Sequence, residues 1–113
     1  NNSLNKYIYN MVDSELSKYI ADKKIMVFSW TMCPYCVKAK NTLTKLGLKY
    51  ETKELDKDPF TNKNTLQELD NLCGFETVPK IFIGKKCIGG CDDMHELIDN
   101  GNFDKILKEQ GIL

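Results

Sequence analysis

The chain has 113 residues, and its 16 basic residues, all of them lysine, balance 16 acidic residues, so the formal net charge is zero. This length predicts a single domain with one hydrophobic core. The neutral charge gives no reason to expect binding to nucleic acid or to a membrane surface, and no apolar run is long enough to span a membrane. Without arginine, an anionic substrate must be bound by lysines, backbone N–H groups or helix termini.

The cysteines indicate a reducing environment. There are five of them, Cys33, Cys36, Cys73, Cys87 and Cys91, and an odd number argues against a secreted disulfide framework. We therefore expect a reducing compartment such as the cytoplasm. The chain does not begin with methionine, so a targeting segment upstream stays open. Cys73 is expected to be a buried cysteine at a helix end, and Cys87 and Cys91 are expected to be bystanders or secondary oxidation sites.

The first half of the chain predicts a helix, a strand and a second helix. Apolar residues at spacings of three and four from Tyr7 to Ile20 predict an amphipathic helix, which belongs to an N-terminal extension, residues 1–22, packed on the domain. The apolar run Ile25–Ser29 predicts a strand buried on both faces. Val37–Leu46 has helical periodicity, and Gly47 is expected to end that helix in a left-handed conformation.

The second half predicts a strand, a helix, a hairpin and two more helices. The expected segments are a strand over Lys49–Leu55, a helix that starts at Asp58-Pro59 and ends at Cys73 before Gly74, hairpin strands Lys80–Ile83 and Lys86–Ile88, a helix opened by Asp92 and Asp93 that runs to Asn100, and a last helix Phe103–Gln110. A helical crossover makes the first two strands parallel. The order predicts an α/β protein whose four-stranded mixed sheet combines a parallel pair with an antiparallel hairpin and carries five helices on both faces.

A pair of cysteines lies where the first strand passes into the second helix. A helix N-terminus offers unpaired N–H groups and the positive end of the helix dipole, so a thiol placed there is stabilised as the nucleophilic thiolate. Pro34 suits the first helical turn because its missing N–H is no loss there. Cys33 is expected to be the exposed nucleophile, and Cys36, one turn further on, is close enough to bond to it. A C-x-x-C in a βαβ pattern is typical of a thioredoxin-like redox motif.

A zinc site is the alternative for these cysteines. A structural zinc ion needs four ligands, usually in two close pairs, and Cys87, Cys91 and His95 could supply the second pair. Cys87 lies in the predicted hairpin and would have to fold back toward the motif. We therefore expect no metal.

Three short motifs together resemble the dithiol glutaredoxins. They are Cys33-Pro34-Tyr35-Cys36, Thr77-Val78-Pro79 and Gly89-Gly90-Cys91-Asp92-Asp93, and they occur in the order and at the spacing of that family. The resemblance extends from about Met11 to Leu113 and implies a single glutaredoxin domain over residues 1–113. It also implies a thioredoxin fold and glutathione-dependent thiol–disulfide exchange.

The resemblance also implies which residues bind glutathione. The Val78-Pro79 bond should be cis, with the Val78 backbone paired to the cysteinyl part of glutathione like a short added strand, and the N-terminus of the helix at Asp92 and Asp93 should hold the γ-glutamyl end. The implied glutathione contacts are Tyr35, Thr77, Val78, Pro79, Cys91, Asp92 and Asp93. Two positions depart from the family pattern. Trp30 replaces a common lysine, which leaves Lys38 and Lys80 as substitutes, and Gln67 lies one position out of register with a family glutamine.

The implied activity is reduction of protein disulfides and of glutathione mixed disulfides. Cys33 attacks the substrate disulfide, Cys36 acts as the resolving thiol, and glutathione is the co-substrate. The expected partners are glutathione and glutathionylated or disulfide-bonded proteins, and the chain is expected to be a monomer. One alternative is a carrier or sensor whose [2Fe–2S] cluster is held by the first cysteine and glutathione. Another is a thioredoxin with its own reductase, against which Tyr35 and the Asp92-Asp93 pair argue.

Overall fold

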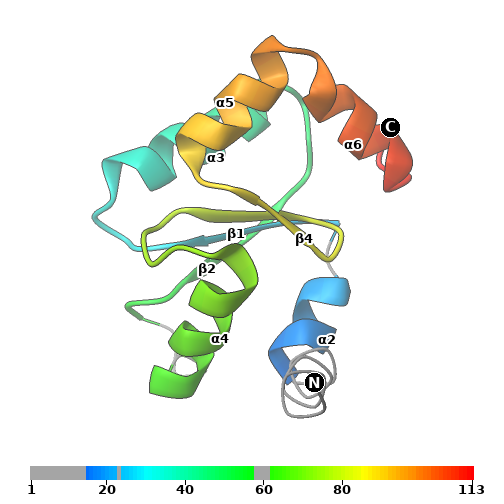
Figure 1. The fold of residues 1–113 in the computed structure, drawn as a ribbon. Coiled ribbons are helices and arrows are strands. Elements are labelled where there is room, and N and C mark those ends of the chain that lie inside the picture. The colour runs from blue at the N-terminus through cyan, green and yellow to red at the C-terminus, as the bar shows by residue number, and fades with distance from the viewer. Residues whose placement is uncertain (1–14, 23, 58–61) are drawn as a thin grey trace.

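The computed structural model describes residues 15–22, 24–57 and 62–113, which form a mixed sheet between two layers of helices (Figure 1). The elements are α2 (Glu15–Ala21), β1 (Ile25–Ser29), α3 (Pro34–Lys45), β2 (Glu51–Glu54), α4 (Lys63–Cys73), β3 (Lys80–Ile83), β4 (Lys86–Gly89), α5 (Cys91–Asp99) and α6 (Asn102–Glu109). Helices α3, α5 and α6 lie on one side of the sheet, and α2 and α4 lie on the other. Within the part of the chain that is described, no helix is long and apolar enough to cross a lipid bilayer.

The sheet has the strand order β2-β1-β3-β4. Strand β1 pairs in parallel with β2 and antiparallel with β3, and β3 continues antiparallel into β4. The crossover from β1 to β2 runs through α3, as parallel pairing requires. The two central strands, β1 and β3, are buried along their whole length. The predicted fold class, a four-stranded mixed sheet with helices on both faces, is confirmed.

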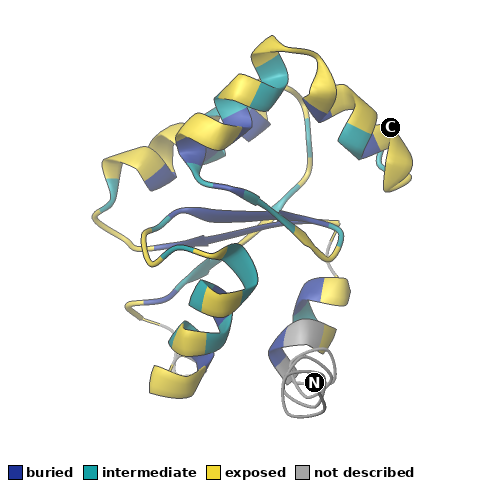
Figure 2. Ribbon diagram, viewed as in Figure 1, coloured by how far each residue is buried: buried dark blue, intermediate teal, exposed yellow. Residues whose placement is uncertain are grey.

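The alternation of side chains along β1 builds two cores, one on each face of the sheet (Figure 2). Ile25 and Val27 point toward α3, α5 and α6, where they join Ala39, Leu43, Ile81, Ile83, Cys91, Met94, Phe103 and Leu107. Met26 and Phe28 point toward the opposite layer, where they join Leu16 and Ile20 of α2 together with Leu55, Leu69 and Phe82. The described part of the N-terminal extension therefore packs on the domain through α2.

Two predicted boundaries change. Helix α4 begins at Lys63, because Asn62 has an extended backbone (φ −140°, ψ 178°) and its side chain accepts a hydrogen bond from the Thr65 N–H at 3.0 Å. The predicted helix start at Asp58-Pro59 is therefore wrong for this helix, and residues 58–61 lie outside the described segments. Strand β2 is shorter than predicted. Of the helix expected from Tyr7 to Ile20, only the part from Glu15 onward lies within the described residues.

A disulfide bond joins two of the cysteines that lie outside the C-x-x-C motif. Cys73, the last residue of α4, is bonded to Cys87 in β4, with 5.4 Å between their Cα atoms. Cys73 ends a helix, as expected, but it is half-buried and bonded, so the expectation of a buried cysteine there is wrong. Cys87 is an oxidation site, one of the two roles expected for it. The pairing depends on how α4 packs against β4, which spacing alone does not show.

Replacing Phe82 tests the core beneath α2 and α4. The ring is 1% exposed and meets Phe28 edge to face, with 5.6 Å between ring centroids. Phe82→Ala should lower the free energy of unfolding by about 3–5 kcal/mol, because it removes buried surface and leaves a cavity. Val37→Ala on α3, where the side chain is 48% exposed, is the matched control and should change it by less than about 0.5 kcal/mol. Urea titration measures both, and equal effects would contradict this core.

Candidate active site

Cys33 is the N-cap of α3, in the turn that follows β1. Its backbone is extended (φ −117°, ψ 108°), Pro34 occupies the first turn, and its sulfur accepts a hydrogen bond from the N–H of Cys36 at 3.2 Å. The side chain is half-buried, so the sulfur is both held by the helix terminus and open to a partner. A negatively charged sulfur accepts such a hydrogen bond more strongly than a neutral one. The expected strand-to-helix placement is confirmed.

The turn before Cys33 is tied to the end of β2 by a residue that the motifs did not reveal. One carboxylate oxygen of Asp56 accepts hydrogen bonds from both the N–H and the hydroxyl of Thr31, each at 3.1 Å. Desolvation is the largest single effect and opposes ionisation. The two hydrogen bonds from Thr31, with the Asp56 backbone N–H and the Lys57 charge, together outweigh it and hold the pKa of Asp56 below its usual value. Asp56 therefore fixes the approach to the nucleophile while it is ionised.

Cys36 is buried behind Cys33 and is kept protonated. Burial, followed by its hydrogen bond to Cys33, raises the pKa of the Cys36 thiol to about 12. At neutral pH the Cys36 sulfur is therefore a poor nucleophile. It has a disulfide within reach only when Cys33 is bonded to a substrate sulfur. The two cysteines therefore have different environments, one half-buried and one buried with a raised pKa.

A groove of about 520 Å³ opens beside Cys33, between the segment before β3 and the N-terminus of α5. The Val78 carbonyl oxygen lies 3.8 Å from the Cys33 sulfur, and the Val78-Pro79 bond is cis, as expected. The groove is lined by Tyr35, Phe75, Thr77, Val78, Pro79, Gly90, Cys91, Asp92 and Asp93. The structure thus brings the seven implied glutathione contacts into one groove. It adds Gly90, which belongs to the double-glycine motif, and Phe75, which no motif singled out.

The N-terminus of α5 forms one end of this groove. Asp93 accepts a hydrogen bond from the Gly90 N–H at 2.9 Å and so caps the helix. Gly89 has φ +117°, and a Cβ there would lie within 2.6 Å of the Asp93 carboxylate carbon, so this position requires glycine. Because Asp93 is occupied by the cap, Asp92 is the acidic side chain with its charge more open to a ligand.

Lys80 is buried, and its ammonium is paired within the protein. Its side chain is 2% exposed, its ammonium lies 2.9 Å from the Asp70 carboxylate, and it donates to the Thr77 carbonyl at 2.9 Å. The same ammonium lies 5.0 Å from the centroid of the Phe75 ring. The hypothesis that Lys80 replaces the missing family lysine is therefore wrong. Lys80 instead positions the groove wall.

Lys38 remains the other substitute. It is exposed on α3, and its charge acts on Cys91 by favouring the anionic thiolate there. Burial is the larger effect at Cys91 and raises the pKa of that thiol. A lysine is thus near the α5 side of the groove, and its contact with a ligand stays a prediction.

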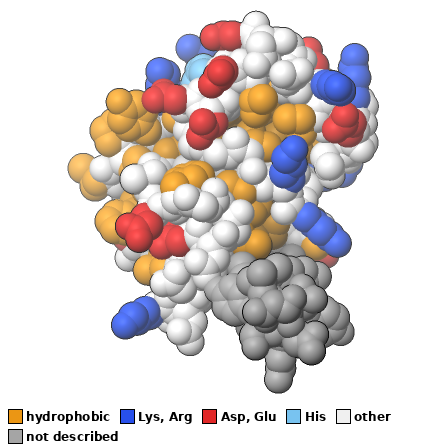
Figure 3. All heavy atoms as spheres, viewed as in Figure 1, with side chains coloured by type: hydrophobic (Ala, Val, Ile, Leu, Met, Phe, Trp, Pro, Cys, Tyr) orange, Lys and Arg blue, Asp and Glu red, His pale blue; other side chains and the backbone are white. Residues whose placement is uncertain are grey.

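The two positions that depart from the glutaredoxin pattern, Gln67 and Trp30, are not among the residues that line the groove. Gln67 is exposed on α4, where its amide donates to Asn71 at 3.1 Å, and it does not line the groove. Trp30 is 50% exposed at the end of β1. Met32, Tyr35 and Val37 are exposed as well, so the segment that carries Cys33 presents several large apolar side chains to solvent. Figure 3 shows hydrophobic side chains gathered on one side of the molecule.

The zinc alternative loses a ligand in this structure. Cys87 is bonded to Cys73, and His95 interacts with the Thr42 hydroxyl at 3.1 Å. Among the described residues, no three histidine, cysteine, aspartate or glutamate side chains lie together in a way that would hold a metal ion.

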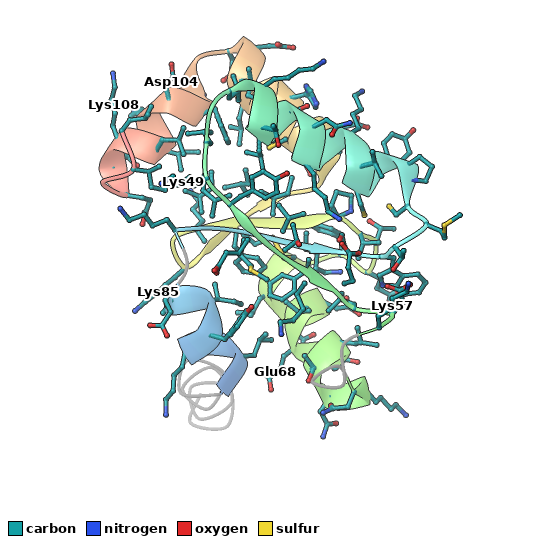
Figure 4. The ribbon with its side chains drawn as sticks, turned by 180° about the vertical axis from the view of Figure 1, so that it is seen from behind. Lys49, Lys57, Glu68, Lys85, Asp104 and Lys108 are labelled. Atoms are coloured by element: carbon teal, nitrogen blue, oxygen red, sulfur yellow. A yellow bond between two sulfur atoms is a disulfide. The ribbon has the colours of Figure 1, made fainter. Side chains whose placement is uncertain are left out.

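Seen from behind, Lys57 lies at the end of the molecule where α3 begins, whereas Asp104 and Lys108 lie on α6 at the far end (Figure 4). The active cysteines are thus remote from the C-terminal helix.

Alkylation of Cys36 at different pH values tests its protonation. In Cys33→Ser, where the outer sulfur no longer consumes reagent, the rate of Cys36 modification by iodoacetamide should rise about tenfold per pH unit between roughly pH 7 and 10. The reason is that burial, the largest cause of the raised pKa of Cys36, persists without the Cys33 sulfur, so the thiolate fraction keeps growing across this range. Peptide mass spectrometry measures the rate. A plateau below about pH 9, typical of an ordinary thiol, would contradict the assignment.

Comparisons with known proteins identify the family. The family model for glutaredoxins matches residues 25–88. Rat glutaredoxin-1 is 41% identical over 96 residues, which cover 83% of this chain and 90% of the rat protein. Human glutaredoxin-1 is 41% identical over 92 residues, which cover 80% of this chain and 87% of the human protein.

Solved structures agree with the sequences. Buckwheat glutaredoxin, determined as a complex with glutathione, superposes with a TM-score of 0.78 at 34% identity, covering 92% of this chain and 96% of that one. Oxidised glutaredoxin 2 from Chlamydomonas reinhardtii superposes with a TM-score of 0.76 at 37% identity, covering 93% and 97%. The thioredoxin fold, the paired cysteines at the start of α3 and the matching relatives together show that the chain belongs to the glutaredoxin family of glutathione-dependent thiol–disulfide oxidoreductases.

Proposed function

We propose that the chain reduces glutathione mixed disulfides and protein disulfides, with Cys33 as nucleophile and Cys36 as resolving thiol. The observation that carries this proposal is the position of the Cys33 sulfur. It lies at the N-terminus of α3, within 3.8 Å of the Val78 carbonyl oxygen at the edge of a groove. A disulfide whose glutathione part occupies the groove is therefore presented to the one sulfur of the motif that is open to it.

Each step exchanges one disulfide bond for another. The Cys33 thiolate attacks the glutathione sulfur of a mixed disulfide, a bond forms between Cys33 and glutathione, and the substrate protein leaves as a thiolate that takes a proton from water. A second glutathione thiolate then attacks, which frees Cys33 and yields glutathione disulfide. With a protein disulfide, Cys33 attacks one sulfur and releases the other as a thiolate that takes a proton. Cys36 then gives up its proton and attacks the Cys33 sulfur, which releases the second substrate thiolate and leaves a Cys33–Cys36 disulfide. Two glutathiones reduce that bond and become glutathione disulfide.

The groove suits the zwitterionic γ-glutamyl end of glutathione. The N–H groups at the start of α5 can receive its α-carboxylate, and the Asp92 carboxylate can receive its α-ammonium. The backbone N–H and C=O of Val78 can pair with the cysteinyl unit as an added strand. Lys38 adds positive charge on the α5 side. Burying these charged ends against paired groups orients the glutathione sulfur toward Cys33.

We also propose that the chain works as a monomer in a reducing compartment such as the cytoplasm. The half-buried free thiol of Cys33 supports the reducing compartment, because an accessible thiol persists where the surroundings are reducing. No particular feature of the described residues favours the [2Fe–2S] carrier over the oxidoreductase. Pro34 at the first turn of α3 restrains the loop that a shared cluster would have to open.

A coupled assay tests the proposed activity. It follows NADPH consumption by glutathione reductase in the presence of glutathione and a small glutathione mixed disulfide. Cys33→Ser should lose at least about 100-fold in rate, because a hydroxyl is not a thiolate nucleophile. Cys36→Ser should keep activity, because the second glutathione does the work of the resolving thiol. An inactive parent, or a Cys33→Ser variant as active as the parent, would contradict the proposal.

Two neighbouring aspartates separate ligand binding from helix capping. Asp92→Ala should raise KM for the glutathione mixed disulfide about tenfold, a typical cost of losing a charge-assisted contact, while kcat stays unchanged. Asp93→Ala should lower the free energy of unfolding by about 1 kcal/mol, because the Gly90 N–H loses its cap. Steady-state kinetics and thermal unfolding of both variants measure the two effects. The opposite pattern, with Asp92→Ala unfolding more easily at unchanged KM, would overturn these roles.

A further inference from the structure

The Cys73–Cys87 disulfide lies outside the catalytic pair and joins two elements that border the groove. Cys73 ends α4, and Cys87 lies in β4, opposite Phe82 of β3. Both cysteines are half-buried at the margin of the core beneath α2 and α4, and Val78 packs against the same core. The bond closes a loop with a sequence separation of 14, and that loop contains the groove-lining segment that reaches Cys33.

The groove wall is anchored at both ends by this arrangement. Gly74 follows Cys73 in a left-handed conformation (φ 80°), and the chain then runs through Phe75, Thr77 and Val78 to β3. At the β3 end, Lys80 holds the Thr77 carbonyl and the Asp70 carboxylate, each at 2.9 Å. At the α4 end, the disulfide is the covalent anchor. Breaking it leaves the α4 end of the wall without a covalent anchor, while the Lys80 contacts with Thr77 and Asp70 remain.

We propose that Cys73 and Cys87 form a second thiol–disulfide couple, which glutathione disulfide oxidises and glutathione reduces, and that its oxidised form binds glutathione more tightly in the groove. The inference rests on the proposed function, because it concerns the same groove. Inside cells a disulfide of this kind is typically redox-sensing. The physical reason for tighter binding is pre-organisation: a wall that is already anchored loses less conformational freedom when the ligand pairs with it.

The chemistry of the couple needs no reagent beyond glutathione in its two forms. One of the two thiols loses its proton and attacks glutathione disulfide, which releases one glutathione thiolate and leaves a mixed disulfide on the protein. The second cysteine loses its proton and attacks the protein sulfur of that bond, which releases a second glutathione thiolate. Two protein thiols are oxidised and one glutathione disulfide is reduced to two glutathiones. Reduction runs the same steps backward, and the partial exposure of both cysteines gives a small thiol access.

As a consequence, the affinity of the groove for glutathione would follow the concentration of the enzyme's own disulfide substrates. When glutathione disulfide accumulates, glutathione mixed disulfides accumulate with it, and the second couple becomes oxidised. The groove then binds the glutathione part of those substrates more tightly. When the pool is reduced again, the couple opens and the affinity falls.

The test uses the full chain with Cys33→Ser and Cys36→Ser, so that the catalytic pair does not interfere. The protein is equilibrated in buffers of graded glutathione to glutathione disulfide ratio, then denatured and alkylated, and the intact mass counts the free thiols. Two alkylation sites should disappear together as the buffer becomes more oxidising, while Cys91 stays free. Calorimetry then measures the Kd of S-methylglutathione for the oxidised form and for the form reduced by a phosphine. The oxidised form should bind roughly three- to thirtyfold more tightly.

The matched control adds Cys73→Ser and Cys87→Ser, and its Kd should equal that of the reduced form and ignore the phosphine. Equal Kd values for the two forms of the test protein, single glutathione adducts in place of the paired loss of thiols, or loss of helical circular dichroism on reduction would each overturn the proposal. The last outcome would make the bond a permanent structural crosslink. If the couple titrates but neither form binds S-methylglutathione, the proposed function fails and the affinity effect fails with it.

Discussion

The site depends on one hydrogen bond, from the Cys36 N–H to the Cys33 sulfur, at the point where a buried strand passes into a helix. Strand β1 is fully buried, so its end is fixed in space, and Asp56 fixes the turn that follows through Thr31. The first turn of α3 then directs its N–H groups at one sulfur and buries the other. A nucleophile and a resolving thiol of the same residue type therefore differ because one lies outside the helix terminus and the other lies inside it.

The groove is built from the second half of the chain and meets this sulfur through the sheet. Strand β3 pairs with β1, which brings Val78 and Pro79 beside the start of α3. Strand β4 follows β3 and delivers the N-terminus of α5 to the other side of the groove. Lys80 holds this wall through an ion pair with Asp70 and a hydrogen bond to the Thr77 carbonyl. Its buried charge is tolerated because these two groups satisfy it. Removing the Asp70 carboxylate would leave the buried Lys80 ammonium without a counter-charge.

Sequence reasoning predicted what depends on local pattern and short motifs. The buried run Ile25–Ser29, the helix stop at Gly74 and the position of Cys33 at a helix N-terminus each follow from neighbouring residues, and the structure has all three. What it missed depends on contacts between distant segments. The cap at Asn62, the Asp56 tether and the Cys73–Cys87 bond become visible only when separate elements are packed. Lys80 was offered as a substitute for the lysine that Trp30 replaces, and only its burial beside Asp70 shows that its charge is already paired.

The most direct test of the account is a crystal structure of Cys36→Ser with glutathione bonded to Cys33. Without its resolving thiol, this variant should hold the mixed disulfide stably. We expect glutathione to lie in the groove of this variant, with its cysteinyl backbone paired to Val78 and its α-ammonium at Asp92. Glutathione lying outside the groove, or bonded to Cys33 without contact to Val78, would contradict the claim that this wall orients the disulfide for attack.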